Sequence, residues 1–164
     1  MKKWTGIEIT EAHQGLEHAA ALNLGRMLFE FSRLDFSLGL MLAWTGEGKQ
    51  LQKRTKELEE FTFHKKLDLL DQLARIRYKH DPKVQMLYTQ WLADAHFTRQ
   101  LRNQLVHGRW GIEPTEDRVV NVTGLPTSPH QLATPYTIAE LAHAVNQMAL
   151  LQRRLAELRS AWPV

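Results

Sequence analysis

The chain has 164 residues, of which 43% are hydrophobic and 24% are charged, and its formal net charge is +3. This length fits one domain with a single core, and the composition is typical of a folded, water-soluble protein. Cysteine is absent, which excludes disulfides, thiolate metal sites and cysteine nucleophiles. The small positive charge is compatible with an anionic partner but does not require one.

The N-terminal segment and the most apolar run argue against export and membrane insertion. Lys2 and Lys3 are followed by no apolar segment, so we expect no secretory signal. The run Leu34–Trp44 contains Asp35 and is too short to span a bilayer. The sequence therefore predicts a cytoplasmic protein that does not associate with a membrane.

Residues 1–18 have no clear hydrophobic period. His13 and Glu17 are spaced to share one face of a helix, but no third metal ligand follows in good register. Metal sites in proteins need a nearly complete ligand set. We therefore expect neither a metal ion nor another cofactor.

Residues 19–44 carry apolar side chains at helical spacing and predict the first helix. Two apolar stripes run along it. The first contains Leu24, Leu28, Phe31, Leu38 and Leu42, and the second contains Phe29, Phe36 and Leu40. A helix that is apolar on two sides is typical of the centre of a bundle or of a subunit interface.

Asp35 interrupts the first stripe, four residues after Phe31 and three before Leu38. A carboxylate among apolar side chains needs a cationic or hydrogen-bonding partner. Arg102 is the partner that we predict, as a structural contact. The alternative is that Asp35 reaches solvent at the margin of the stripe.

Three further helices are expected, over residues 50–78, 82–107 and 137–160. The second of these starts with Asp81 as N-cap and Pro82 in the first turn. Gly108 follows it as the expected C′ residue. The last begins with a capping-box pattern, in which Thr137 is followed three residues later by Glu140.

Between the last two helices the helical period disappears. Residues 109–112 and 118–122 are rich in strand-forming residues and flank a turn, which predicts a short β-hairpin. Residues 124–135 contain three prolines and are expected to form a loop. The predicted fold is all-α: an up-and-down four-helix bundle with a short β-hairpin between the third and fourth main helices, in a single domain over residues 1–164.

The end of the third helix carries the residues best suited to chemistry, Arg102, Asn103 and His107. Cleaving RNA without a metal needs a base for the 2′-hydroxyl, an acid for the leaving 5′-oxygen and positive charge beside the phosphate. His107 can act as base or acid, Arg102 can hold the phosphate through two parallel hydrogen bonds, and Asn103 can orient either group. Arg99 and Arg109 would extend the cationic surface for RNA.

Arg-Asn-x-x-x-His at the end of a helix, in a predicted four-helix layout, resembles the motif of the HEPN family. Members of this family are small helical domains, many of them metal-independent endoribonucleases. The resemblance implies a homodimer that brings two copies of the motif together, and an RNA substrate cleaved to a 2′,3′-cyclic phosphate and a 5′-hydroxyl. It also suggests a toxin with a cognate antitoxin, or a defence element.

In one branch of that family, a tyrosine two residues after the histidine is modified by a nucleotidyltransferase antitoxin. Arg109 occupies that position here, so this modification is not expected.

A structural interpretation of the Arg-Asn-x-x-x-His residues also stays open. A histidine in the last turn interacts favourably with the helix dipole whatever its function, and Arg102 could simply neutralise Asp35. The chain would then be a non-catalytic helical module that binds a nucleotide or RNA, or only dimerises, or a regulatory protein without a nucleic-acid role.

Overall fold

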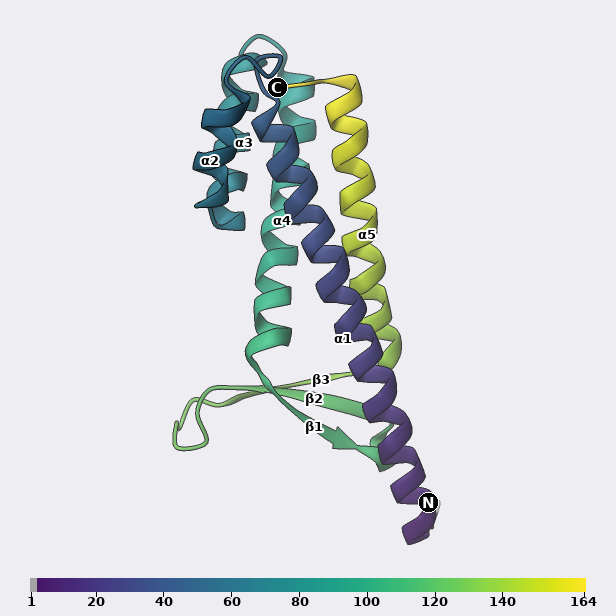
Figure 1. The fold of residues 1–164 in the computed structure, drawn as a ribbon. Helices are drawn as coiled ribbons and strands as arrows, with labels where there is room; N and C mark the ends of the chain where they lie inside the picture. The colour runs from purple at the N-terminus through teal and green to yellow at the C-terminus, as the bar shows by residue number, and fades with distance from the viewer. Residues whose placement is uncertain (1–2) are drawn as a thin grey trace. The chain divides into compact units, whose positions relative to one another are not determined.

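The computed structural model describes residues 3–164, in which helices predominate and a small sheet is inserted late in the chain (Figure 1). The chain divides into two compact units, each built from two segments. The sheet unit combines the chain up to Phe29 with Arg102–Gln147, and the helical unit combines Glu30–Leu101 with Met148–Val164. The elements are α1 (Gly6–Ala43), α2 (Leu51–Glu59), α3 (Phe63–Arg77), α4 (Pro82–His107), β1 (Arg109–Glu113), a 3-10 turn (Pro114–Glu116), β2 (Arg118–Thr123), β3 (Leu132–Tyr136) and α5 (Ile138–Ala161).

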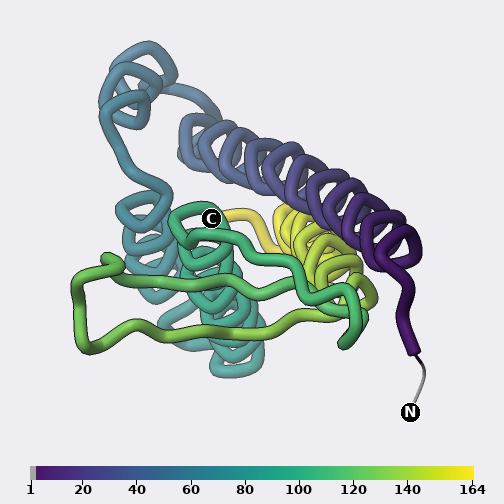
Figure 2. Tube along the Cα trace, turned by 90° about the horizontal axis from the view of Figure 1, so that it is seen from below, coloured from purple at the N-terminus to yellow at the C-terminus, as the bar shows by residue number. Residues whose placement is uncertain are grey.

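The sheet unit contains three antiparallel strands in the order β1-β2-β3. The tube in Figure 2 shows the strands side by side. Asn121 lies in the central strand, opposite Trp110 of β1 and Thr134 of β3. The apolar core of this unit is formed by Leu16, Ala20, Met27, Leu105, Val119 and Leu141.

The helical unit has a core to which each of its long helices contributes. Leu38 of α1, Leu70 of α3, Trp91 of α4 and Leu155 of α5 are all buried. The indole N–H of Trp91 donates to the carbonyl oxygen of Leu151 at 3.0 Å. A buried polar group thus keeps a hydrogen-bond partner, as burial requires.

The first helix is longer than predicted, because it begins at Gly6 instead of near residue 19. Thr5 and Glu8 form a reciprocal capping box at its start. The backbone N–H of Thr5 donates to the Glu8 carboxylate at 2.8 Å, and the backbone N–H of Glu8 donates to the Thr5 hydroxyl at 3.2 Å. This cap satisfies two N–H groups that a helix leaves without partners, although the first three turns have little apolar periodicity.

The predicted helix over residues 50–78 is two helices, α2 and α3, separated at residues 60–62. Thr62 is the N-cap of α3, and its hydroxyl accepts a hydrogen bond from the backbone N–H of Lys65 at 3.3 Å. The prediction of one helix was wrong here because a local cap starts a new helix within a charged stretch.

The caps predicted at Asp81 and Thr137 are confirmed. Each side chain accepts a hydrogen bond from the backbone N–H three residues further on, at 3.1 Å for Asp81 and 3.2 Å for Thr137.

The hairpin is confirmed as β1 and β2, but it belongs to a larger sheet. Residues 132–135, predicted as loop, belong to β3 (Leu132–Tyr136), which pairs with β2. Pro135 is tolerated there because β3 is an edge strand, where a missing N–H costs no internal ladder bond.

Among the described residues, no helix combines the length and the apolar character needed to cross a membrane.

Candidate functional site

The residues of the predicted site lie at the junction of α4 with β1. Arg102, Asn103 and His107 occupy the last turns of α4, which ends at His107, and Arg109 is the first residue of β1. All four belong to the sheet unit. A helix end joined to a strand by a single residue has little freedom, so these side chains are presented from a well-defined backbone.

Arg102 and Asn103 interact directly. The Nη1 group of Arg102 donates to Oδ1 of Asn103 at 3.0 Å, and both side chains are half-buried. Asn103 therefore orients the guanidinium group of Arg102. His107 lies one helical turn after Asn103 and is exposed, so its imidazole is accessible to a substrate.

Gln104 and Trp110 hold the end of α4 against the sheet. The amide nitrogen of Gln104 donates to the hydroxyl groups of Thr134 and Tyr136 in β3, at 3.3 and 3.2 Å. The indole N–H of Trp110 donates to the carbonyl oxygen of Leu105 at 3.1 Å. Burial, and secondarily the charge of Glu140, raises the pKa of Tyr136, which therefore stays neutral and able to donate or accept. Sequence reasoning did not identify Gln104, because the strand that supplies its partners was not predicted and Thr134 was expected to lie in a loop.

Gly108 directly follows the end of α4 at His107, as predicted. A C′ glycine commonly adopts a left-handed conformation, but Gly108 is not among the residues with positive φ. A Cβ atom at this position would lie 2.2 Å from both polar atoms of the Asn121 side chain. Asn121 is completely buried, so Gly108 is needed because a side-chain amide packs directly on its Cα.

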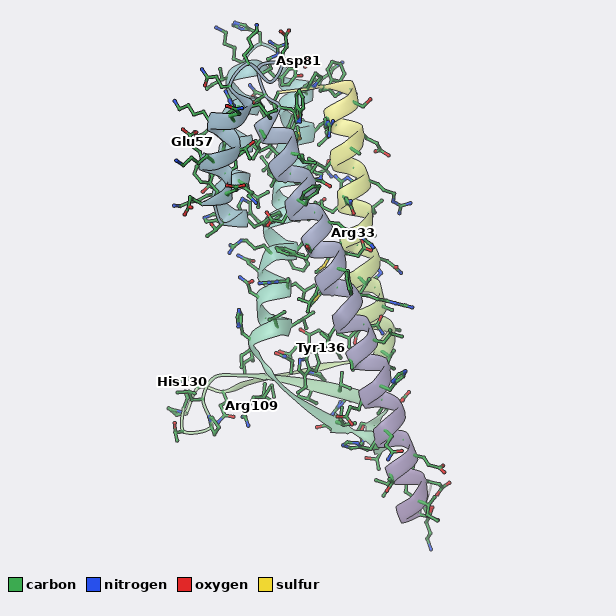
Figure 3. The ribbon with its side chains drawn as sticks, in the orientation of Figure 1. Arg33, Glu57, Asp81, Arg109, His130 and Tyr136 are labelled. Carbon is green, nitrogen blue, oxygen red and sulfur yellow. The ribbon has the colours of Figure 1, made fainter. Side chains whose placement is uncertain are left out.

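Arg109 lies beside the loop between β2 and β3. It is exposed, and its Nη2 group donates to the side-chain oxygen of Gln131 at 3.2 Å. Gln131 in turn donates to the carbonyl oxygen of Pro126 at 2.8 Å. Figure 3 shows Arg109 and the exposed His130 at the same end of the sheet. This end of the sheet therefore carries a cation, Arg109, and a second imidazole, His130, and His130 lies outside the Arg-Asn-x-x-x-His motif.

Arg99 and Asp35, the two other predicted residues, belong to the helical unit. Asp35 finds a cationic partner in Lys66 of α3, and its predicted contact with Arg102 stays a prediction. The ammonium group of Lys66 lies 2.7 Å from Oδ1 of Asp35, and the two side chains are 12% and 37% exposed. Gly39 lies beside this ion pair, since a Cβ atom at its position would be 3.7 Å from Nζ of Lys66. A pairing from α3 could not be read from spacing within α1 and α4.

Part of the apolar surface of α1 is exposed to solvent. In the first predicted stripe, Phe31, Leu38 and Leu42 are buried as expected, whereas Leu28 is 46% exposed. The second predicted stripe is exposed throughout. Phe29, Phe36 and Leu40 are 68%, 67% and 40% accessible. Large apolar side chains gathered on one helix face typically mark an interaction surface.

A cluster that the sequence analysis missed lies in the helical unit. His64 and Asp68 of α3 and His96 of α4 have ligand atoms within 4.8 Å of one another. Burial, followed by the positive charges of His64 and Arg99, lowers the pKa of His96. A small groove of about 220 Å³ adjoins the cluster and is lined in part by Asp68, Asp71 and His96. The only signal in the sequence was the i, i+4 spacing of His64 and Asp68.

Comparison of the chain with protein-family models, curated proteins and solved structures yields no match. The function is therefore inferred from the side chains and their geometry. Two groupings have chemical potential: the motif at the end of α4 in the sheet unit, and the histidine-aspartate cluster between α3 and α4 in the helical unit.

Proposed function

We propose that this protein is a metal-independent endoribonuclease of the HEPN type that acts as a homodimer. One observation carries the proposal: six residues at the end of α4 present an oriented guanidinium group and an exposed imidazole. Arg102 is hydrogen-bonded to Asn103 at 3.0 Å, and His107 is exposed in the last turn. These are the group types that phosphodiester cleavage without a metal requires.

In the proposed reaction the 2′-hydroxyl of RNA attacks the adjacent phosphorus atom. A histidine removes the hydroxyl proton, and the bond to the 5′-oxygen breaks as that oxygen receives a proton from an acid. Arg102 stabilises the negative charge that develops on the phosphoryl oxygens. Asn103 holds the guanidinium group in position, and Arg109 contacts the strand. The products are a 2′,3′-cyclic phosphate and a 5′-hydroxyl.

One motif supplies one histidine, so the reaction calls for a second copy. In a homodimer, His107 of one protomer would serve as base and its symmetry mate as acid. The exposed apolar face of α1 supports such an assembly, because Phe29, Phe36 and Leu40 would leave water at an interface. The proposal treats α1, α3, α4 and α5 as the four helices of a HEPN bundle, with α2 and the sheet as additions.

RNA cleavage in EDTA tests the proposal. The untagged wild-type protein is expected to cut single-stranded RNA with EDTA present, and His107→Ala is expected to lose at least about 100-fold in rate, the typical contribution of an acid-base group. His143→Ala is the matched control, because His143 is an exposed helical histidine of the same unit. It should cut normally. Circular dichroism must show that both variants are folded.

The alternatives predict different results. RNA binding that Arg102→Ala weakens, without any cleavage, would identify a non-catalytic RNA-binding module. A dimer that neither cuts nor binds RNA would leave only a dimerisation role. If the protein is a toxin, its expression should arrest growth, His107→Ala should relieve the arrest, and a cognate antitoxin should restore growth when coexpressed.

A further inference from the structure

His64, Asp68 and His96 are not used in the proposed RNA chemistry. His64 and Asp68 are one turn apart on α3, and His96 projects from α4. All three belong to the helical unit. We propose that they bind a divalent transition-metal ion, with Zn²⁺ the best match, and that the ion links α3 to α4.

The distances are close to those that a bound ion needs. Zinc-ligand bonds of about 2.0–2.1 Å at tetrahedral angles place the ligand atoms about 3.4 Å apart. Nε2 of His64 lies 3.7 Å from Oδ2 of Asp68, and all three ligand atoms lie within 4.8 Å of one another. The side chains of His64 and Asp68 are each 52% exposed. Rotation of these side chains can therefore bring the ligand atoms closer by the remaining ~1.4 Å, without movement of the helices.

The arrangement of the two imidazole rings supports the same conclusion. The ring centroids of His64 and His96 are 5.4 Å apart, and the rings are inclined at 72°. A metal ion binds imidazole in its neutral form, so two rings at this separation can both act as ligands of one ion, with the Asp68 carboxylate as the third ligand.

Two imidazoles and one carboxylate suit Zn²⁺ better than Mg²⁺ or Ca²⁺, which prefer oxygen ligands. The other carboxylate that lines the groove is that of Asp71. Its two oxygens already accept hydrogen bonds from Nε of Arg75 at 2.9 and 2.8 Å. The fourth position of the ion is therefore left to water or to a small anion in the groove.

Zinc binding to the full-length protein, with any histidine tag removed, tests the site. Isothermal titration should give one Zn²⁺ per chain, and Co²⁺ should give visible absorption bands of a low-coordinate site. His64→Gln and His96→Gln should each weaken binding by at least about 10-fold, because even outer-shell changes have effects of that order. His143→Gln should bind as the wild type does. Zn²⁺ should also raise the Tm of the wild type, but not that of His96→Gln.

Failure to bind Zn²⁺ stoichiometrically would overturn the proposal, and so would binding that both glutamine variants retain. His64 is exposed, so His64→Gln is expected to fold and remains informative if His96→Gln does not. The outcome is separable from that of the ribonuclease proposal. Cleavage is expected in EDTA and depends on His107, whereas the metal site is measured by binding and depends on His64 and His96.

Discussion

Replacing Gly108 by alanine is the most direct test of how the end of α4 is held. The added Cβ would lie 2.2 Å from Nδ2 and from Oδ1 of Asn121, and 2.4 Å from its Cγ. Ordinary contact begins at 3.4 Å, so the shortest approach falls short by 3.4 − 2.2 = 1.2 Å. Asn121 is fully buried in the central strand. Its amide therefore cannot swing into solvent without opening the sheet.

The expected loss is about 3 kcal/mol in the free energy of unfolding, the upper part of the range for overpacking a filled site. One feature favours the upper part: the blocking atoms form a branched, buried amide instead of the flexible end of a long side chain.

Urea unfolding followed by circular dichroism measures this loss of stability, and a double-mutant cycle tests whether the Asn121 side chain causes it. In an Asn121→Ala background the obstructing atoms are gone, so Gly108→Ala should cost at least about 1.5 kcal/mol less than in the wild type. Gly111→Ala is the control, because the nearest atom to a Cβ there is a carbonyl oxygen 4.0 Å away. Equal costs for the two glycines, or an unchanged cost without the Asn121 amide, would refute the reasoning.

Three further predictions concern other parts of the molecule. Because the pKa of His96 is lowered in the folded protein, the unfolded chain binds more protons than the folded one below pH 6.5. The free energy of unfolding should therefore fall as the pH drops below 6.5, and His96→Gln should make it depend less on pH in urea titrations at several pH values. Lys66→Met should destabilise the protein by about 1–2 kcal/mol, because the half-buried Asp35 loses the ammonium group of Lys66. Adding Asp35→Asn should recover part of that lost stability, and free-energy changes of the two substitutions that simply add would contradict the reasoning. Phe36→Glu should convert the proposed dimer to a folded monomer in analytical ultracentrifugation and abolish RNA cleavage, whereas an unchanged sedimentation coefficient would exclude this face of α1 as the interface.

The sequence predicted well what short-range interactions decide. The start of α4 at Pro82 and its end at His107, the capping box before α5, and the hairpin of β1 and β2 all depend on residues within one or two turns of each other. The placement of Arg102, Asn103 and His107 on one helix end followed from the same local rules. Even the missed start of α1 was local, since Thr5 and Glu8 carry the same capping signal as Thr137 and Glu140.

Only the tertiary structure decided which distant side chains meet. It paired Asp35 with Lys66, added β3 to the hairpin, and brought His96 to His64 and Asp68. It also explains why position 108 needs a glycine, because the side-chain amide of Asn121, thirteen residues further along the chain, packs against it. Periodicity specifies the face of a helix on which a side chain lies, but the partner on that face is chosen by the packing of the whole chain. Those contacts therefore could not be read from residue spacing alone.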